Sequence, residues 1–212
     1  EFRRVLFRSE KDLKTRKTEA LKEARVTYAE DIAFYKMLQY LFFKQWRELK
    51  AYANENGIEI IGDVPIYVAG DSADVWANPK QFYLDEDLNP IEVAGCPPDG
   101  FSADGQLWGN PQYDWQAMKA ENYTWWKKRF HKLYSMVDIV RIDHFRGFES
   151  YWEVDGKAKK LSGGHLLNAS AAIISIVLLA VYLQSGSTLA LIGMTLALSS
   201  TISTRPLSGA PT

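Results

Sequence analysis

One segment of the chain, 140–147 (VRIDHFRG), has residue types that suit nucleophilic or acid–base chemistry. Successive side chains of a strand point to opposite faces, so Arg141 and Asp143 share one face and Val140 and Ile142 the other. A hydrophobic core gains little from such a pair, because ionised groups away from water are costly unless matched. An active site gains more, because the cation keeps the carboxylate ionised and oriented. The alternative is that Asp143 caps the next helix while Arg141 reaches solvent.

Predicted strands and helices would position this pair. Apolar residues at three- and four-residue spacing predict helix from about residue 11 to 56, with Gly57 as a left-handed C-cap, and again over 126–137. A mostly apolar, β-branched run predicts a buried strand over 58–66, and a second strand is predicted over 139–142.

The order of these elements is strand, long loop over 69–111, helix, strand, which is a βαβ unit with parallel strands. Parallel neighbours place their carboxyl ends at the same edge. We therefore expect Asp63 and Asp143 to share one rim, which in an α/β barrel is where the chemistry takes place.

The composition bounds the partners. The 212 residues are 47% hydrophobic and 24% charged, and the net charge of −1 gives no reason to expect a nucleic-acid partner. A single cysteine excludes an internal disulfide and fits a reducing compartment, so we expect a cytoplasmic protein. The charge is uneven, because Arg205 is the only charged residue after Lys160.

Several segments occur in an order typical of one enzyme family. Together with 140–147 they resemble the 4-α-glucanotransferases (amylomaltases) of glycoside hydrolase family 77, over about residues 14–154. The matching segments are 34–46 (FYKMLQYLFFKQW), 60–69 (IIGDVPIYVA), 71–79 (DSADVWANP), 94–102 (AGCPPDGFS) and 106–111 (QLWGNP). The resemblance implies an α/β fold, a fragment of a (β/α)8 TIM barrel around strands 3 and 4. The composition of the residues that follow predicts an apolar, helical tail.

The same resemblance divides the chain into three parts. Residues 1–9 look like an adaptor-derived scar, 10–155 like a partial glucanotransferase barrel, and 156–212 like an uncharged apolar tail. The tail is a chimeric join, a frameshifted continuation or a membrane-inserting hairpin, and the abrupt loss of charge favours a join. A membrane partner is expected only if 169–198 is a genuine segment.

The resemblance also implies a site and a mechanism. Retaining transfer between α-1,4-glucans such as maltooligosaccharides needs one carboxyl group to attack and another to protonate the leaving oxygen. The implied catalytic residues are Asp143, the nucleophile, and Arg141, which orients it. The implied sugar contacts, at positions that match the family, are Asp63, His144, Asp99, Phe101 and Trp108.

Some expected components are missing from the motifs. The family's general acid lies on a later strand for which no motif is recognised, so we expect the chain alone to be inactive. Neither a cofactor nor a metal is expected. The run 85–96 begins like a calcium loop, but Pro90 and Cys96 occupy the positions where an EF-hand needs Gly and Glu.

Other functions remain open. An α-amylase-like hydrolase would share the Arg-x-Asp strand, although the 97–99 and 106–109 segments favour a transferase. A non-catalytic membrane-anchored protein and a glucan-binding module without catalysis are the further alternatives.

Overall fold

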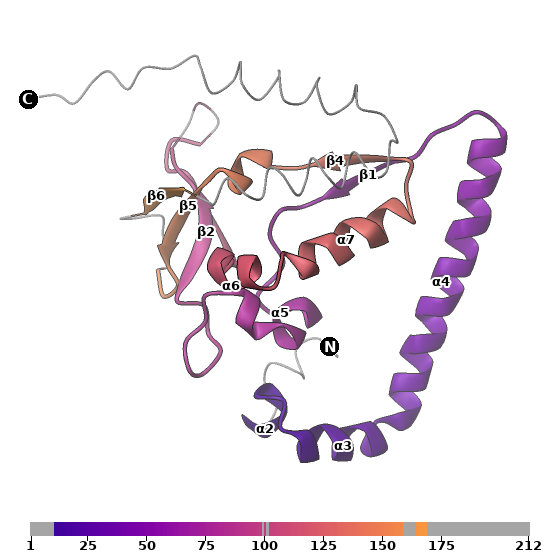
Figure 1. Ribbon diagram of the computed structural model, residues 1–212, viewed down its shortest axis with the longest axis horizontal. Coiled ribbons are helices and arrows are strands. Elements are labelled where there is room, and N and C mark those ends of the chain that lie inside the picture. The colour runs from indigo at the N-terminus through magenta and orange to yellow at the C-terminus, as the bar shows by residue number, and fades with distance from the viewer. Residues whose placement is uncertain (1–10, 99, 101, 159–163, 169–212) are drawn as a thin grey trace, which may run out of the picture.

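The computed structural model describes residues 11–98, 100, 102–158 and 164–168 (Figure 1). In chain order its elements are α2 (Lys11–Lys14), α3 (Thr18–Thr27), α4 (Ala29–Glu55), β1 (Ile61–Val64), α5 (Ala73–Ala77), η1 (Pro79–Gln81), β2 (Glu92–Cys96), β3 (Gln106–Pro111), α6 (Trp115–Ala120), α7 (Thr124–Tyr134), β4 (Ile139–Ile142), η2 (Phe145–Phe148), β5 (Ser150–Asp155) and β6 (His165–Asn168).

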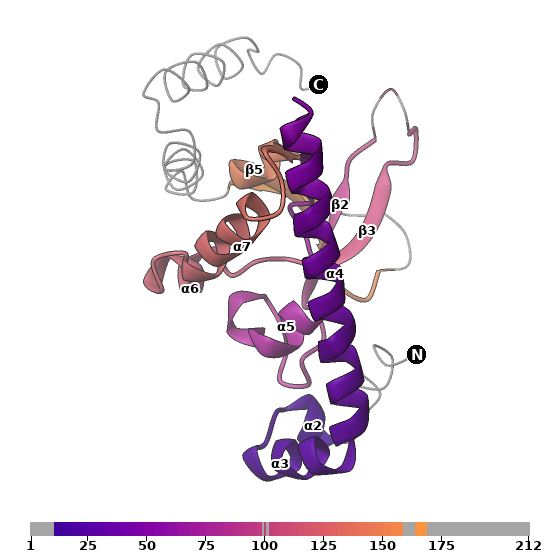
Figure 2. The same ribbon diagram turned by 90° about the vertical axis from the view of Figure 1, so that its right-hand side faces the viewer.

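The first helical region is three helices instead of one. Arg16 adopts a left-handed conformation (φ 59°) just after α2, and a second break at Tyr28 separates α3 from α4. The 27 residues of α4 run along one side of the molecule in Figure 1, and this side faces the viewer in Figure 2. Gly57 has φ 72° just after α4, as its C-cap position predicted.

The strands β1 and β4 are parallel, as predicted, and pair with Asp63 opposite Arg141. The prediction of a fully buried strand over 58–66 is wrong, since β1 is shorter and only one of its faces is covered. Val64 packs into the core that includes residues of α7, whereas Ile61 is 64% exposed. Figure 1 shows α7 alongside this two-stranded sheet.

A second sheet has four antiparallel strands in the order β3-β2-β5-β6. The segment 69–111, predicted as a loop, supplies its β2–β3 hairpin as well as α5. The strand β6 begins at His165, inside the predicted helical tail, because its backbone pairs with β5. Residues 1–9 and 169–212 lie outside the described residues, and with them all of the predicted scar and most of the predicted tail.

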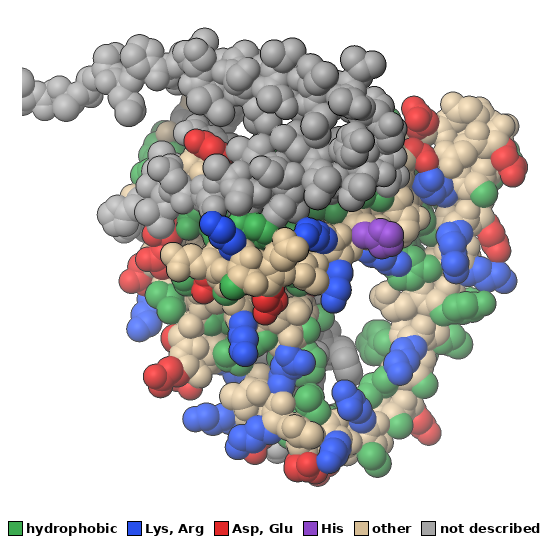
Figure 3. Space-filling view, viewed as in Figure 1, with side chains coloured by type: hydrophobic (Ala, Val, Ile, Leu, Met, Phe, Trp, Pro, Cys, Tyr) green, Lys and Arg blue, Asp and Glu red, His purple; other side chains and the backbone are tan. Residues whose placement is uncertain are grey.

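Aromatic side chains dominate the core, which includes residues of both sheets. Tyr113, Trp126 and Phe148 are almost completely buried. The rings of Trp126 and Phe148 meet edge-on, with their centroids 4.9 Å apart. By contrast, α4 exposes large apolar side chains, and Figure 3 shows them in green along this helix. No helix within the described ranges is both long enough and apolar enough to cross a membrane.

Asp138 joins α4 to the starts of β1 and β4. Its carboxylate pairs with Lys50 and accepts hydrogen bonds from the Asn54 side chain (2.8 Å) and the Ile60 amide (2.9 Å). These bonds lower the Asp138 pKa to about 2, and the bond from Lys50 contributes most. The long helix is therefore attached to the sheet at the end opposite the predicted site.

Candidate functional site

The centre of the site is an ion pair across the two parallel strands. The Arg141 guanidinium donates two hydrogen bonds to Asp63, one from Nε and one from a terminal nitrogen, and the Nε–Oδ1 distance is 2.5 Å. Hydrogen bonding from Arg141 lowers the Asp63 pKa below its usual value, and the pair raises the pKa of Arg141. Both side chains are exposed, so the pair faces the open side of the sheet.

Asp143 lies one residue beyond the end of β4. Its amide donates to the Val64 carbonyl at 3.3 Å, which continues the β1–β4 pairing, and its side chain is exposed. The sequence predicted that Arg141 would orient Asp143, and that role stays a prediction. The guanidinium hydrogen-bonds to Asp63. The parallel register makes Asp63 its direct neighbour. The charge of Asp143 also raises the pKa of Arg141, but less than Asp63 does.

His144 follows in a left-handed conformation, with φ 50°. This region is uncommon for residues other than glycine and often marks a constrained functional position. Its carbonyl accepts from the Gly147 amide at 2.9 Å. A Cβ at Gly147 would lie 2.6 Å from Ile66 Cδ1 and 3.0 Å from His144 Cδ2, so both of these side chains would have to shift.

Trp108, on β3, reaches this turn from the other sheet. Its ring meets the His144 ring edge-on at 5.1 Å, and its indole nitrogen donates to the Gln106 side chain at 2.9 Å. Two predicted sugar contacts, distant in sequence, are therefore in direct contact. The predicted contacts Asp99 and Phe101 lie outside the described residues.

Sequence reasoning missed Tyr67, whose ring centroid lies 6.1 Å from that of Trp108 and 6.4 Å from that of His144. The available signal was the position of Tyr67 in the 60–69 segment. However, β1 ends at Val64, and the chain bends just after Pro65. Strand alternation therefore could not predict the direction of the Tyr67 side chain.

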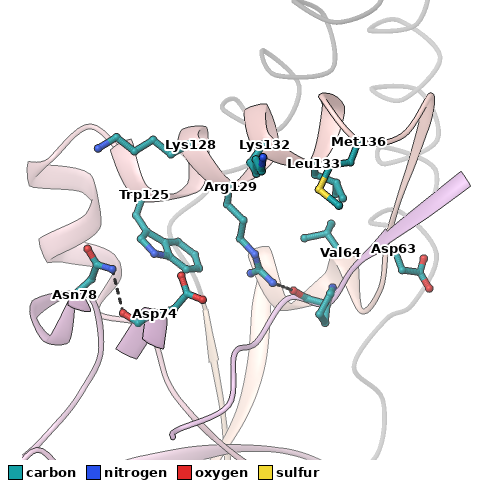
Figure 4. A pocket seen from close by; sticks show the side chains of 11 residues that line it. Asp63, Val64, Asp74, Asn78, Trp125, Lys128, Arg129, Lys132, Leu133 and Met136 are labelled. Carbon is teal, nitrogen blue, oxygen red and sulfur yellow. Dashed lines mark hydrogen bonds between the residues drawn. The ribbon is translucent and has the colours of Figure 1, made fainter. Parts of the chain in front are cut away.

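A pocket of about 490 Å³ lies behind β1, between α7 and α5 (Figure 4). Arg129 crosses it and donates to the Pro65 carbonyl at 2.7 Å, while its guanidinium lies over the rings of Trp125 (5.2 Å) and Trp126 (4.9 Å). Asp63 also lines this pocket. Arg129 therefore fixes the chain at the point where it leaves β1 and approaches the site.

A second perturbed carboxyl group lies in the four-stranded sheet. Glu153 on β5 is only 7% exposed and shares a hydrogen bond with Glu92 on β2. Burial, and then the bond to Glu92, raise the Glu153 pKa to about 8. Burial and the bond to Glu92 favour the protonated form of Glu153, which avoids placing two negative charges side by side.

The comparisons with known proteins agree on one family. The family model described as "4-alpha-glucanotransferase" matches residues 4–191. The chain belongs to the 4-alpha-glucanotransferase family. The resemblance predicted from the motifs is thereby confirmed, and the match of the family model extends beyond residue 154, where the resemblance in the motifs ended.

Individual relatives of this family support the assignment. A 4-alpha-glucanotransferase of Streptococcus pneumoniae is 55% identical over 143 residues, which are 68% of this chain and 28% of the relative. One from Thermus thermophilus is 49% identical over 157 residues, 74% of this chain and 31% of the relative. The structure also resembles that of "Amylomaltase from Streptococcus agalactiae in complex with acarbose", with a TM-score of 0.79 and 42% identity, covering 86% of this chain and 36% of that one. The chain thus spans about a third of the length of these 4-alpha-glucanotransferases.

Proposed function

We propose that this chain supplies the nucleophile region of a 4-α-glucanotransferase, which transfers α-1,4-glucan segments between maltooligosaccharides. The observation that carries the proposal is the position of Asp143, exposed at the end of β4, next to the Asp63–Arg141 pair and the Trp108–His144 contact. In this proposal β1 and β4 are neighbouring strands, the third and fourth, of a (β/α)8 barrel.

The chemistry assigned to Asp143 is attack on the anomeric carbon of the donor sugar. The carboxylate oxygen forms a glucosyl ester while the bond to the leaving oxygen breaks, and the 4-hydroxyl of an acceptor glucan then displaces the ester. Protonation of the leaving oxygen needs a second carboxyl group. We assign that group to the part of the family's length that this chain does not span.

Arg141 and Asp63 would prepare the site for this reaction. Arg141 carries a positive charge that offsets the negative charge of Asp63. The repulsion between the Asp63 and Asp143 carboxylates is therefore reduced. Each Asp63 oxygen keeps a further lone pair for a sugar hydroxyl. Trp108 would offer an aromatic face to a glucose ring, and His144 a hydrogen bond to a hydroxyl group.

A chimera tests the proposal. The segment of the Streptococcus pneumoniae relative that matches this chain is replaced by the corresponding residues of this chain, and the product is incubated with maltotriose. We expect free glucose together with lengthened chains, as transfer requires. Shortened chains alone would favour a hydrolase. If the chimera forms no products while the unmodified relative is active, the proposal is contradicted.

A further inference from the structure

Tyr67 connects the aromatic core to the candidate site. Its ring stacks on Tyr113 in the core, with centroids 6.0 Å apart and planes inclined by 15°. The same ring lies near both Trp108 and His144, which are themselves in contact. Tyr67, Trp108 and His144 therefore form a group of three rings, which we call the aromatic triad, and Tyr67 continues this triad into the core.

The backbone around Tyr67 is held by side chains from other parts of the chain. Arg129 and Tyr113 donate to the carbonyls of the two residues before it, at 2.7 and 2.6 Å. Asn110 donates to the carbonyl of the residue after it, at 2.9 Å. With only 8% of its surface exposed, Tyr67 is a fixed member of the triad.

The other two members depend more on their surroundings. His144 is partly buried in a left-handed conformation, and Trp108 is partly buried on β3. An aromatic neighbour that is itself anchored restricts the orientation of both rings. Burial also raises the pKa of the Tyr67 hydroxyl, so the side chain stays neutral.

We propose that Tyr67 is a positioning residue whose ring holds Trp108 and His144 in the orientation that binds sugar. This inference rests on the proposed function. It assigns the role to the ring and not to the hydroxyl, which hydrogen-bonds with the Gln112 side chain. Tyr67→Phe should therefore preserve the arrangement, and Tyr67→Leu should lose it.

The test uses the 212-residue chain and two readouts. The first is the NMR signal of the His144 ring, which is sensitive to the neighbouring aromatic rings. The chain has only three histidines, so this signal can be assigned. The second is binding of acarbose, followed by tryptophan fluorescence. Tyr67→Leu should shift the His144 signals and weaken acarbose binding about tenfold, the upper range for loss of an aromatic pair. Tyr67→Phe should match the parent in both.

Phe82→Leu is the matched control, because Phe82 is also buried and packs on Tyr113, with ring centroids 5.2 Å apart. Its other ring contact is with Trp125. A purely structural role for Tyr67 predicts equal effects of the two leucine variants on His144, and that result overturns the inference. So do unchanged His144 signals in Tyr67→Leu. If that variant does not fold, Tyr67→Met fills the space without a ring and gives the same comparison.

The two readouts separate this inference from the proposed function. If the folded parent does not bind acarbose, the proposed function fails for this chain, whereas the NMR comparison still decides whether Tyr67 orients His144. If the parent binds acarbose and Tyr67→Leu binds it equally well, the positioning role is overturned and the proposed function stands.

Discussion

The two sheets of this chain differ in what their side chains face. In the two-stranded sheet, Ile61, Asp63 and Arg141 are exposed. In the four-stranded sheet, Val154 is buried, and even the carboxyl group of Glu153 is covered. Arg141 lies on the less covered sheet and Asp143 just beyond its end, while the other sheet and the aromatic core fix the parts of the chain that reach toward them. Stability and chemistry should therefore respond to different substitutions.

The largest expected effect is on the core. Phe148→Ala removes a fully buried ring that packs on Trp126, and should lower the free energy of unfolding by about 3–5 kcal/mol. Tyr52→Ala removes a side chain from α4 that is 66% exposed, and should change the free energy of unfolding by less than about 0.5 kcal/mol. Urea denaturation measures both. Equal losses would remove the distinction between core and exposed helix.

A smaller effect is expected where the core meets β1. Arg129→Ala removes the hydrogen bonds to the carbonyls of Pro65 and Ile66 and the stacking on two tryptophans, and should cost about 2 kcal/mol. Arg129→Lys keeps the charge but lacks the planar fork, so it should recover only part of the loss. Full recovery by lysine would show that charge alone matters at this position.

The buried carboxyl group of the four-stranded sheet predicts a pH dependence. The Glu153 pKa is raised from 4.5 to about 8 in the folded chain, so the folded state keeps a proton that the unfolded state releases. Stability from this group is complete below pH 4.5 and falls as the pH rises toward 8. Glu153→Gln should remove this fall. The test compares the denaturation midpoints of the parent and of Glu153→Gln at about pH 5 and about pH 8.5, on either side of the raised pKa. An equal change in midpoint between the two pH values for both proteins would contradict the assignment.

The smallest effect on stability is expected at the exposed ion pair. Asp63→Asn removes the charge that Arg141 binds, but solvent-exposed pairs contribute little to folding. The denaturation midpoint should stay close to that of the parent. A marked drop would mean that the two-stranded sheet depends on this pair for its structure.

Much of the two-stranded sheet could be predicted from sequence. Strand alternation and the βαβ order indicated the parallel pairing and the bounds 139–142, because both depend on local patterns. The partner of Arg141 could not be predicted in the same way, since it depends on the register between strands that are far apart in sequence. The Tyr67–Trp108–His144 contacts also depend on how the hairpin folds back over the turn after Asp143.

The most direct test of the central claim is Asp143→Asn in the chimera described above. If Asp143 is the nucleophile, transfer from maltotriose should fall by roughly 10³-fold or more while acarbose binding is largely kept. Turnover close to that of the unsubstituted chimera would contradict the account, because the carboxylate at the end of β4 would then not be the group that attacks the sugar.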